Sequence, residues 1–155
     1  MGKFFQWKVL RWVLLVIVVL LGGIQFVPVD RSNPAVETEI PAPANVGAVL
    51  KRSCYNCHSN ETVWPWYSRV APVSWFVASD VHEGREELNF STWSRYTAKE
   101  QFDRLKDVLE EVEDGGMPPW WYLPFHREAR LSDAERTLLR TWILGAPQPS
   151  GQGGM

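Results

Sequence analysis

Cysteine, histidine and methionine are all scarce in this chain. Its 155 residues include two cysteines, three histidines and three methionines. A structural zinc site needs four ligands, and with no second cysteine pair the chain offers no recognisable set of them. An excess of basic charge is missing as well, because 16 Lys and Arg residues face 18 Asp and Glu residues. This balance argues against a nucleic-acid partner.

Strand-like alternation of apolar and polar residues is also missing beyond the N-terminal region, where helix signals recur instead. Thr97 and Glu100 form a capping box that predicts a helix through about residue 113, ended by Gly115-Gly116. Ser132 opens the last helix, and Gly145 ends it. The other expected helices cover residues 45–53, with Asn45 as the N-cap, and Val73–Leu88. The predicted fold class is all-α, with about four helices.

Both cysteines lie in one pentapeptide, Cys54-Tyr55-Asn56-Cys57-His58. A C-x-x-C-H run is the attachment signature of a c-type haem. On a helical turn, two intervening residues bring both sulfurs to one edge of the porphyrin, and the histidine then coordinates the iron. The motif predicts one covalent haem c held by Cys54, Cys57 and His58. A redox dithiol or a metal-only site is the alternative, although a dithiol normally opens a helix in a βαβ unit.

The second iron ligand is predicted to be Met117, the only methionine away from the chain ends. It follows a glycine helix stop and precedes Pro118-Pro119, so it lies on a stiff loop, where less freedom is lost when the sulfur is fixed. Ordinary core filling is the alternative role for a lone methionine. His126 is the next candidate ligand, because it lies at the end of the same loop, and His82 is the last.

An uninterrupted apolar run covers residues 12–24, and residues 9–27 add only two polar side chains. As a helix this stretch reaches roughly 28 Å, close to the thickness of a bilayer's hydrocarbon core. Three basic residues precede it, so residues 1–8 are expected in the cytoplasm and the rest of the chain on the periplasmic or extracytoplasmic side. The sequence therefore predicts an uncleaved transmembrane anchor over residues 9–27. A cleaved signal peptide is the alternative, but no good cleavage site follows the run.

The remaining chain is expected to form a linker, one domain and a tail. Residues 28–44 are proline-rich and predict a linker. A haem-binding domain is expected over residues 45–146, and residues 147–155 are expected to be disordered. Beyond the apolar run, thirteen basic residues face eighteen acidic ones, a formal charge of −5. Seven of the nine tryptophans fall in the domain and are suited to lining a porphyrin, although ordinary core packing explains any single one.

Several runs together resemble the bacterial haem-binding-domain family of small cytochrome c-like proteins. The resemblance covers nearly everything from Val27 to Ile143. The runs that carry it are Val27-Pro28-Val29-Asp30-Arg31, Cys54 to Thr62, Trp64-Pro65-Trp66-Tyr67-Ser68, Ala71 to Trp75, Glu83-Gly84-Arg85, Leu88-Asn89-Phe90-Ser91, Met117-Pro118, Tyr122, His126 and Ala129-Arg130-Leu131-Ser132.

This resemblance implies a membrane-anchored monohaem c-type cytochrome with His58 and Met117 as axial ligands. The resemblance implies no particular reaction. A six-coordinate haem in an apolar, tryptophan-rich pocket predicts an electron carrier rather than an enzyme, working with a redox partner protein that the sequence does not identify. A haem-based sensor or peroxidase-like protein with a labile sixth ligand is the alternative, in which His82, Arg69 or Arg85 supplies a distal polar group. A structural subunit whose haem only stabilises the fold is a third possibility.

Overall fold

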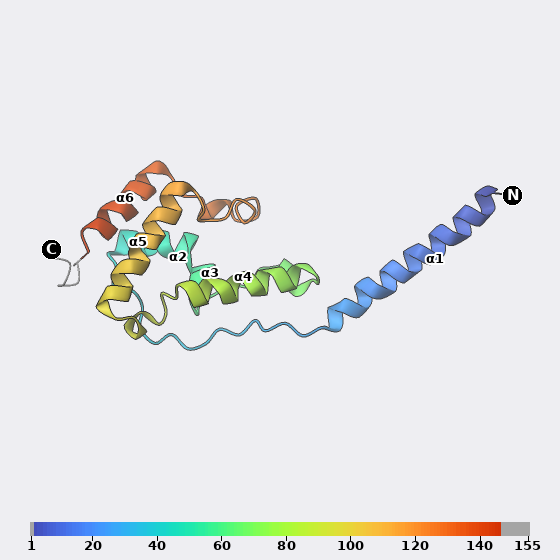
Figure 1. The fold of residues 1–155 in the computed structure, drawn as a ribbon, viewed down its shortest axis with the longest axis horizontal. Helices are drawn as coiled ribbons and strands as arrows, with labels where there is room; N and C mark the ends of the chain where they lie inside the picture. The colour runs from blue at the N-terminus through green and yellow to red at the C-terminus, as the bar shows by residue number, and fades with distance from the viewer. Residues whose placement is uncertain (1, 147–155) are drawn as a thin grey trace, which may run out of the picture. The chain divides into compact units, whose positions relative to one another are not determined.

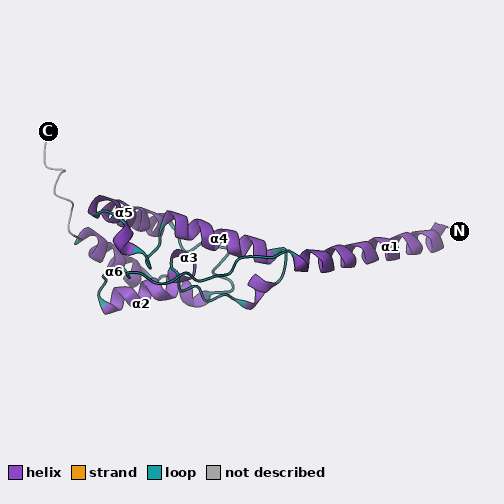
Figure 2. Ribbon diagram, turned by 90° about the horizontal axis from the view of Figure 1, so that it is seen from below, coloured by secondary structure: helices purple, strands orange, loops and turns teal. Residues whose placement is uncertain are grey.

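The structure is a computed structural model that describes residues 2–146. Its helices are α1 (Gly2–Gly23), α2 (Ala44–Ser53), α3 (Tyr55–His58), α4 (Val73–Glu87), α5 (Ala98–Asp114) and α6 (Asp133–Leu144), as Figure 1 shows. Within the described range no residue lies in a β-strand (Figure 2), and one isolated bridge pairs Thr38 with Thr92. The prediction of an all-α fold is confirmed. The tail predicted to be disordered, residues 147–155, lies outside the described residues.

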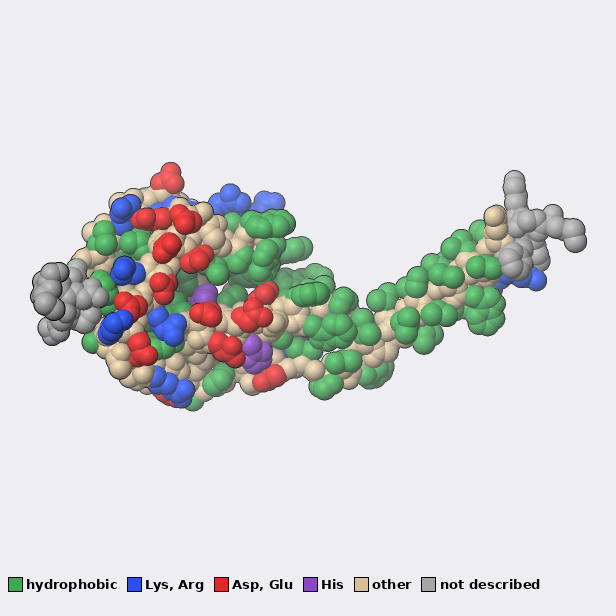
Figure 3. All heavy atoms as spheres, viewed as in Figure 1, with side chains coloured by type: hydrophobic (Ala, Val, Ile, Leu, Met, Phe, Trp, Pro, Cys, Tyr) green, Lys and Arg blue, Asp and Glu red, His purple; other side chains and the backbone are tan. Residues whose placement is uncertain are grey.

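The chain divides into two compact units. The first comprises residues 1–32 together with 64–80, and the second comprises residues 33–63 together with those from 81 onward. In the first unit α1 continues into a short 3-10 helix, η1 (Ile24–Phe26). The segment Gln6–Phe26 is long and apolar enough to cross a membrane, and none of it is buried. Apolar side chains cover this helix (Figure 3).

The core of the second unit forms where α6 packs against α2 and α5. Each of these helices contributes apolar residues to one cluster. The most deeply buried of its large side chains are Val46, Leu50, Phe90, Leu139 and Ile143. Tyr55 stacks on Phe90 with ring centroids 5.4 Å apart, which connects the short helix α3 to this core.

Helices α5 and α6 begin after Thr97 and Ser132, as the sequence predicts, and each of these residues belongs to a capping box. The Oγ atoms of Thr97 and Ser132 each accept the backbone N–H three residues on, and the glutamates there reach back to the cap. Gly115 ends α5 with φ 77°, a left-handed conformation that favours glycine. The last helix ends at Gly145, as expected.

The predicted N-cap of the helix before the cysteines is wrong. Asn45 lies inside α2, and Pro43 is the N-cap, with no side chain that accepts a capping bond. The reason is that helical hydrogen bonding already begins at the Pro43 carbonyl, which accepts the N–H of Gly47 at 2.8 Å. A proline ring supplies the fixed φ for this entry, and no side-chain cap is used.

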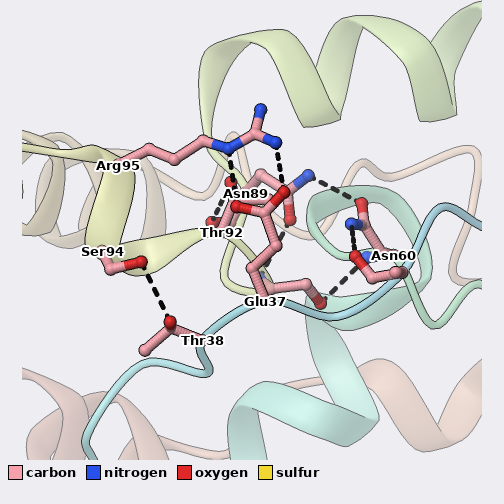
Figure 4. A network of polar contacts seen from close by, with 9 residues as sticks. Glu37, Thr38, Asn60, Asn89, Thr92, Ser94 and Arg95 are labelled. Atoms are coloured by element: carbon pink, nitrogen blue, oxygen red, sulfur yellow. Dashed lines mark hydrogen bonds and ion pairs between the residues drawn. The ribbon is translucent and has the colours of Figure 1, made fainter.

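Residues 33–43, part of the linker predicted over residues 28–44, are hydrogen-bonded to other residues of the second unit. The N–H of Ile40 donates to the carbonyl of Phe90 at 3.1 Å, and the N–H of Trp93 donates to that of Thr38 at 3.0 Å. The Ile40 side chain is buried in the core cluster. Figure 4 shows polar side chains that join this segment to the chain around it, among them Glu37, Thr38, Asn60, Asn89, Thr92, Ser94 and Arg95.

Candidate functional site

The two cysteines lie at a helical turn that continues from α2 into α3. The N–H of Cys54 still donates to Leu50 of α2, at 2.8 Å, while its own carbonyl accepts the N–H groups of Cys57 and His58 at 3.2 and 3.0 Å. Three residues apart on such a turn, the two side chains lie on one face. The two cysteines are not joined in a disulfide. The geometry thus provides two neighbouring sulfurs followed immediately by an imidazole.

The imidazole of His58 is held by backbone carbonyls. Its Nδ1 lies 2.8 Å from the carbonyl oxygen of Gly84 and 3.2 Å from that of Leu88. Because a carbonyl only accepts, Nδ1 carries the proton and Nε2 keeps its lone pair. Burial lowers the pKa of His58 despite these carbonyl contacts, which favours the neutral ring. A neutral ring with an oriented Nε2 lone pair is the form that coordinates a metal.

Helix α4 approaches the cysteine turn closely at Gly84. A Cβ atom built on Gly84 meets the Cys57 carbonyl oxygen at 2.9 Å and the Cys57 Cβ at 3.1 Å. No larger residue fits without moving the backbone, so this glycine allows its own carbonyl to reach His58. Sequence reasoning missed this role. The signal was an isolated glycine inside a helical pattern, which often marks a close packing contact.

The loop after the motif is held by Arg85. Its Nε donates to the Ser59 carbonyl at 2.8 Å, and one terminal nitrogen donates to Thr62 Oγ1 at 2.9 Å and Asn33 Oδ1 at 2.8 Å. Arg85 is predicted above as a distal polar group of a sensor or peroxidase-like protein, whereas its guanidinium binds the loop that follows His58. His82, offered for the same role, is exposed on α4.

The loop that carries the predicted second ligand is attached to the cysteine motif. Asn56, between the two cysteines, donates from Nδ2 to the Tyr122 hydroxyl at 2.8 Å. The Tyr122 ring stacks on His126 at 4.0 Å between centroids and 9° between planes. His126 Nδ1 lies 3.2 Å from Glu128 Oε1. Met117 begins this loop, with 36% of its surface exposed. The fold therefore joins this loop to the motif at Tyr122.

A redox dithiol and a metal-only site are the alternative roles of the two cysteines. Burial, with a contribution from Cys57, raises the pKa of Cys54 to about 12. Redox-active dithiols depend on a lowered thiol pKa, so this environment does not favour one. Among the described residues no three His, Cys, Asp or Glu side chains form a group able to hold a metal ion. The donor set of two thiols and one oriented imidazole fits a haem better than either alternative.

A small helical protein with this arrangement belongs to the class that binds haem. A family model described as haem-binding domain matches residues 19–144. The chain therefore belongs to the haem-binding-domain family. Neither the comparison with curated proteins nor that with solved structures gave a match.

Proposed function

We propose that this protein is a membrane-anchored monohaem c-type cytochrome that carries single electrons. The observation that carries the proposal is the imidazole of His58, fixed by two carbonyls directly after two thiols on the same turn. The haem iron supplies one-electron chemistry by alternating between Fe(III) and Fe(II). Cys54 and Cys57 would hold the haem by thioether bonds, and the free Nε2 of His58 would coordinate its iron.

Met117 is the proposed second axial ligand. A thioether ligand raises the reduction potential, which suits an electron carrier. Support comes from the Asn56–Tyr122 hydrogen bond, because it joins the loop that Met117 begins to the cysteine turn. The competing ligand, His126, already has its ring stacked on Tyr122 and its Nδ1 near Glu128.

The apolar N-terminal helix is the proposed anchor. The segment Gln6–Phe26 is long enough for one crossing, and Lys8 and Arg11 lie near its N-terminal end. By the positive-inside rule this end stays in the cytoplasm, and the cysteine motif is exported across the inner membrane. Covalent haem attachment of this kind takes place outside the cytoplasm. An anchored carrier searches for its redox partner in two dimensions.

The proposal is tested on the full chain, purified from the membrane fraction of a bacterial host that attaches haem to C-x-x-C-H motifs. Haem staining of a denaturing gel reports covalent attachment, and optical spectra of both oxidation states report ligation. We expect a stained band, rapid equilibration with a small redox mediator and no carbon monoxide binding at neutral pH. Ready carbon monoxide binding would instead support the sensor or peroxidase-like function, and loss of haem on denaturation would contradict c-type attachment.

A further inference from the structure

Residues 64–79 are rich in aromatic side chains and poor in charge. Arg69 is their only charged residue, and they contain no acidic residue, although the chain has 18. The surface over α5, by contrast, gathers many acidic side chains (Figure 3). Five of the sixteen residues in this segment are aromatic. These are Trp64, Trp66, Tyr67, Trp75 and Phe76.

Much of this apolar surface faces outward. Trp66 is 75% exposed and Phe76 is 69% exposed. Val73 and Phe76 lie three residues apart on the first turn of α4, so they share one face of that helix. Val70 is also exposed. A cluster of exposed large apolar side chains marks an interaction surface.

A pair of hydrogen bonds ties this segment to the end of the apolar helix. The Gln25 side chain donates from Nε2 to the Ala71 carbonyl at 3.0 Å and accepts the Ala71 N–H on Oε1 at 2.9 Å. Arg31 adds a bond from its guanidinium to the Ser68 carbonyl at 3.2 Å. Gln25 is the last residue but one of the segment that can cross a membrane. Ala71 therefore lies beside the C-terminal end of that segment.

We propose that residues 66–76 form a second membrane contact, in which the exposed aromatic and valine side chains enter the phospholipid interface of the leaflet where α1 ends. This inference rests on the membrane anchor of the proposed function. Tryptophan and tyrosine rings favour the headgroup region, and the long side chain of Arg69 can keep its guanidinium at that level. The Gln25 pair satisfies both backbone polar groups of Ala71, which an apolar environment requires.

Lipid fits this surface better than a protein partner does, because hydrogen bonds with Gln25 and Arg31 hold the segment near the end of the span. The bonds to Gln25 hold it at the end of the span whether or not another protein is present. Trp66 and Phe76 are each five residues from Ala71, so a fully extended chain limits them to about 18 Å from it. Exposed apolar residues at this place meet headgroups and upper acyl chains before any soluble surface.

The test uses the full chain in native membranes, with the photoreactive residue p-benzoylphenylalanine placed at one position per variant. Phe76 and Trp66 are the test positions, and either one serves if the other variant fails to fold. Leu15 in α1 is the positive control for the anchor, and Glu110 on the acidic helix α5 is the control for a water-exposed position. After illumination, mass spectrometry measures the fraction of each chain that carries one added phospholipid.

We expect lipid adducts at positions 15, 66 and 76, and none at 110. Adducts at 15 without any at 66 and 76 would overturn this inference while leaving the anchor intact. No adduct at 15 would overturn the anchor, and the inference with it. Cross-links from 66 and 76 to another protein chain in place of lipid would show that a protein covers the surface, which also overturns the inference.

A variant of the hydrogen-bonded pair tests how the segment is held. Gln25→Leu keeps the apolar length of the span but removes both bonds to Ala71. We expect the lipid adduct at position 76 to fall several-fold and the adduct at position 15 to stay unchanged. An undiminished adduct at position 76 in this variant would overturn the role assigned to Gln25.

Discussion

The Nδ1 atom of His58 lies 2.8 Å from the carbonyl oxygen of Gly84, a residue 26 positions further along the chain. This contact fixes the tautomer and the plane of the ring, because a peptide carbonyl accepts a hydrogen bond and donates none. The same glycine lacks the Cβ that would collide with Cys57. One residue of α4 therefore both makes room for the cysteine turn and orients the imidazole.

Replacing Gly84 by alanine tests this close approach. Because the new Cβ meets backbone atoms of Cys57 rather than the end of a flexible side chain, we expect Gly84→Ala to lower the free energy of unfolding by about 1–3 kcal/mol. The haem content of the purified protein should fall as well. Denaturant titration followed by haem absorbance measures the first effect.

Gly47→Ala in α2 is the matched control. No atom lies within 4 Å of a Cβ built there, so alanine should be tolerated or stabilise the helix by up to about 1 kcal/mol. Equal effects of the two substitutions would contradict the close approach at Gly84.

Covalent attachment predicts that haem stays with the chain after denaturation. Acidified acetone should extract no haem from the unsubstituted protein. With Cys54→Ser or Cys57→Ser, one thioether remains, so haem should stay bound. The optical spectrum should shift, because one vinyl group of the haem stays unreacted. The double variant should release all of its haem. Extraction of haem from the unsubstituted protein would exclude thioether bonds at both positions.

Ligation by Met117 predicts specific spectral changes. Met117→Ala should lower the reduction potential, remove the weak near-red sulfur-to-iron band and allow carbon monoxide to bind. His126→Ala is the control, and it should leave all three properties nearly unchanged. An unchanged spectrum in Met117→Ala, with loss of the same features in His126→Ala, would transfer the second ligand to His126.

Glu135 links stability to acidic pH. Its carboxylate accepts the Ser132 N–H at 2.9 Å and pairs with Arg52 at 2.8 Å. These interactions, led by those with Ser132, lower the pKa of Glu135 to about 2 from its ordinary 4.5. Since the folded-state pKa is the lower one, the stabilisation is present above about pH 4.5 and is lost as the pH falls towards 2.

Glu135→Gln should therefore cost roughly 0.5–1 kcal/mol at pH 7, because the amide oxygen still accepts the Ser132 N–H but the charge that pairs with Arg52 is lost. The difference from the unsubstituted protein should shrink below pH 4.5, as measured by denaturant titrations across the acid range. Glu110→Gln, on the exposed face of α5, is the control and should have little effect at pH 7. A constant difference down to pH 2 would contradict the low pKa.

Retention of the anchor predicts that the mature chain keeps its N-terminal helix. Intact-mass analysis of protein from the membrane fraction should show a chain that includes residues 6–26, and alkaline washing should not release it. A mature chain that starts near Pro28 would identify the segment as a cleaved signal. Leu14→Lys together with Ile17→Lys interrupts the apolar span. This double variant should move the protein to the soluble fraction.

Signals that act within a few residues were readable from the sequence. The capping boxes at Thr97 and Ser132 form between side chains and backbone groups three residues apart, so their outcome needs no tertiary structure. Gly115 ends its helix because glycine tolerates a positive φ. The predicted N-cap of α2 is wrong, because Asn45 has a good capping side chain but the N-cap is Pro43.

The spacing of Cys54, Cys57 and His58 and the apolar N-terminal helix were determined by the sequence itself, because each is a property of neighbouring residues. The family follows from the sequence over residues 19–144. Only the tertiary structure decided which groups hold these elements in place. The Gly84 carbonyl reaches His58 across 26 residues, and Gln25 pairs with Ala71 across 46. Every residue has a backbone carbonyl, so the sequence does not show which carbonyl will accept a given hydrogen bond. Tertiary packing decides that the Gly84 carbonyl contacts His58.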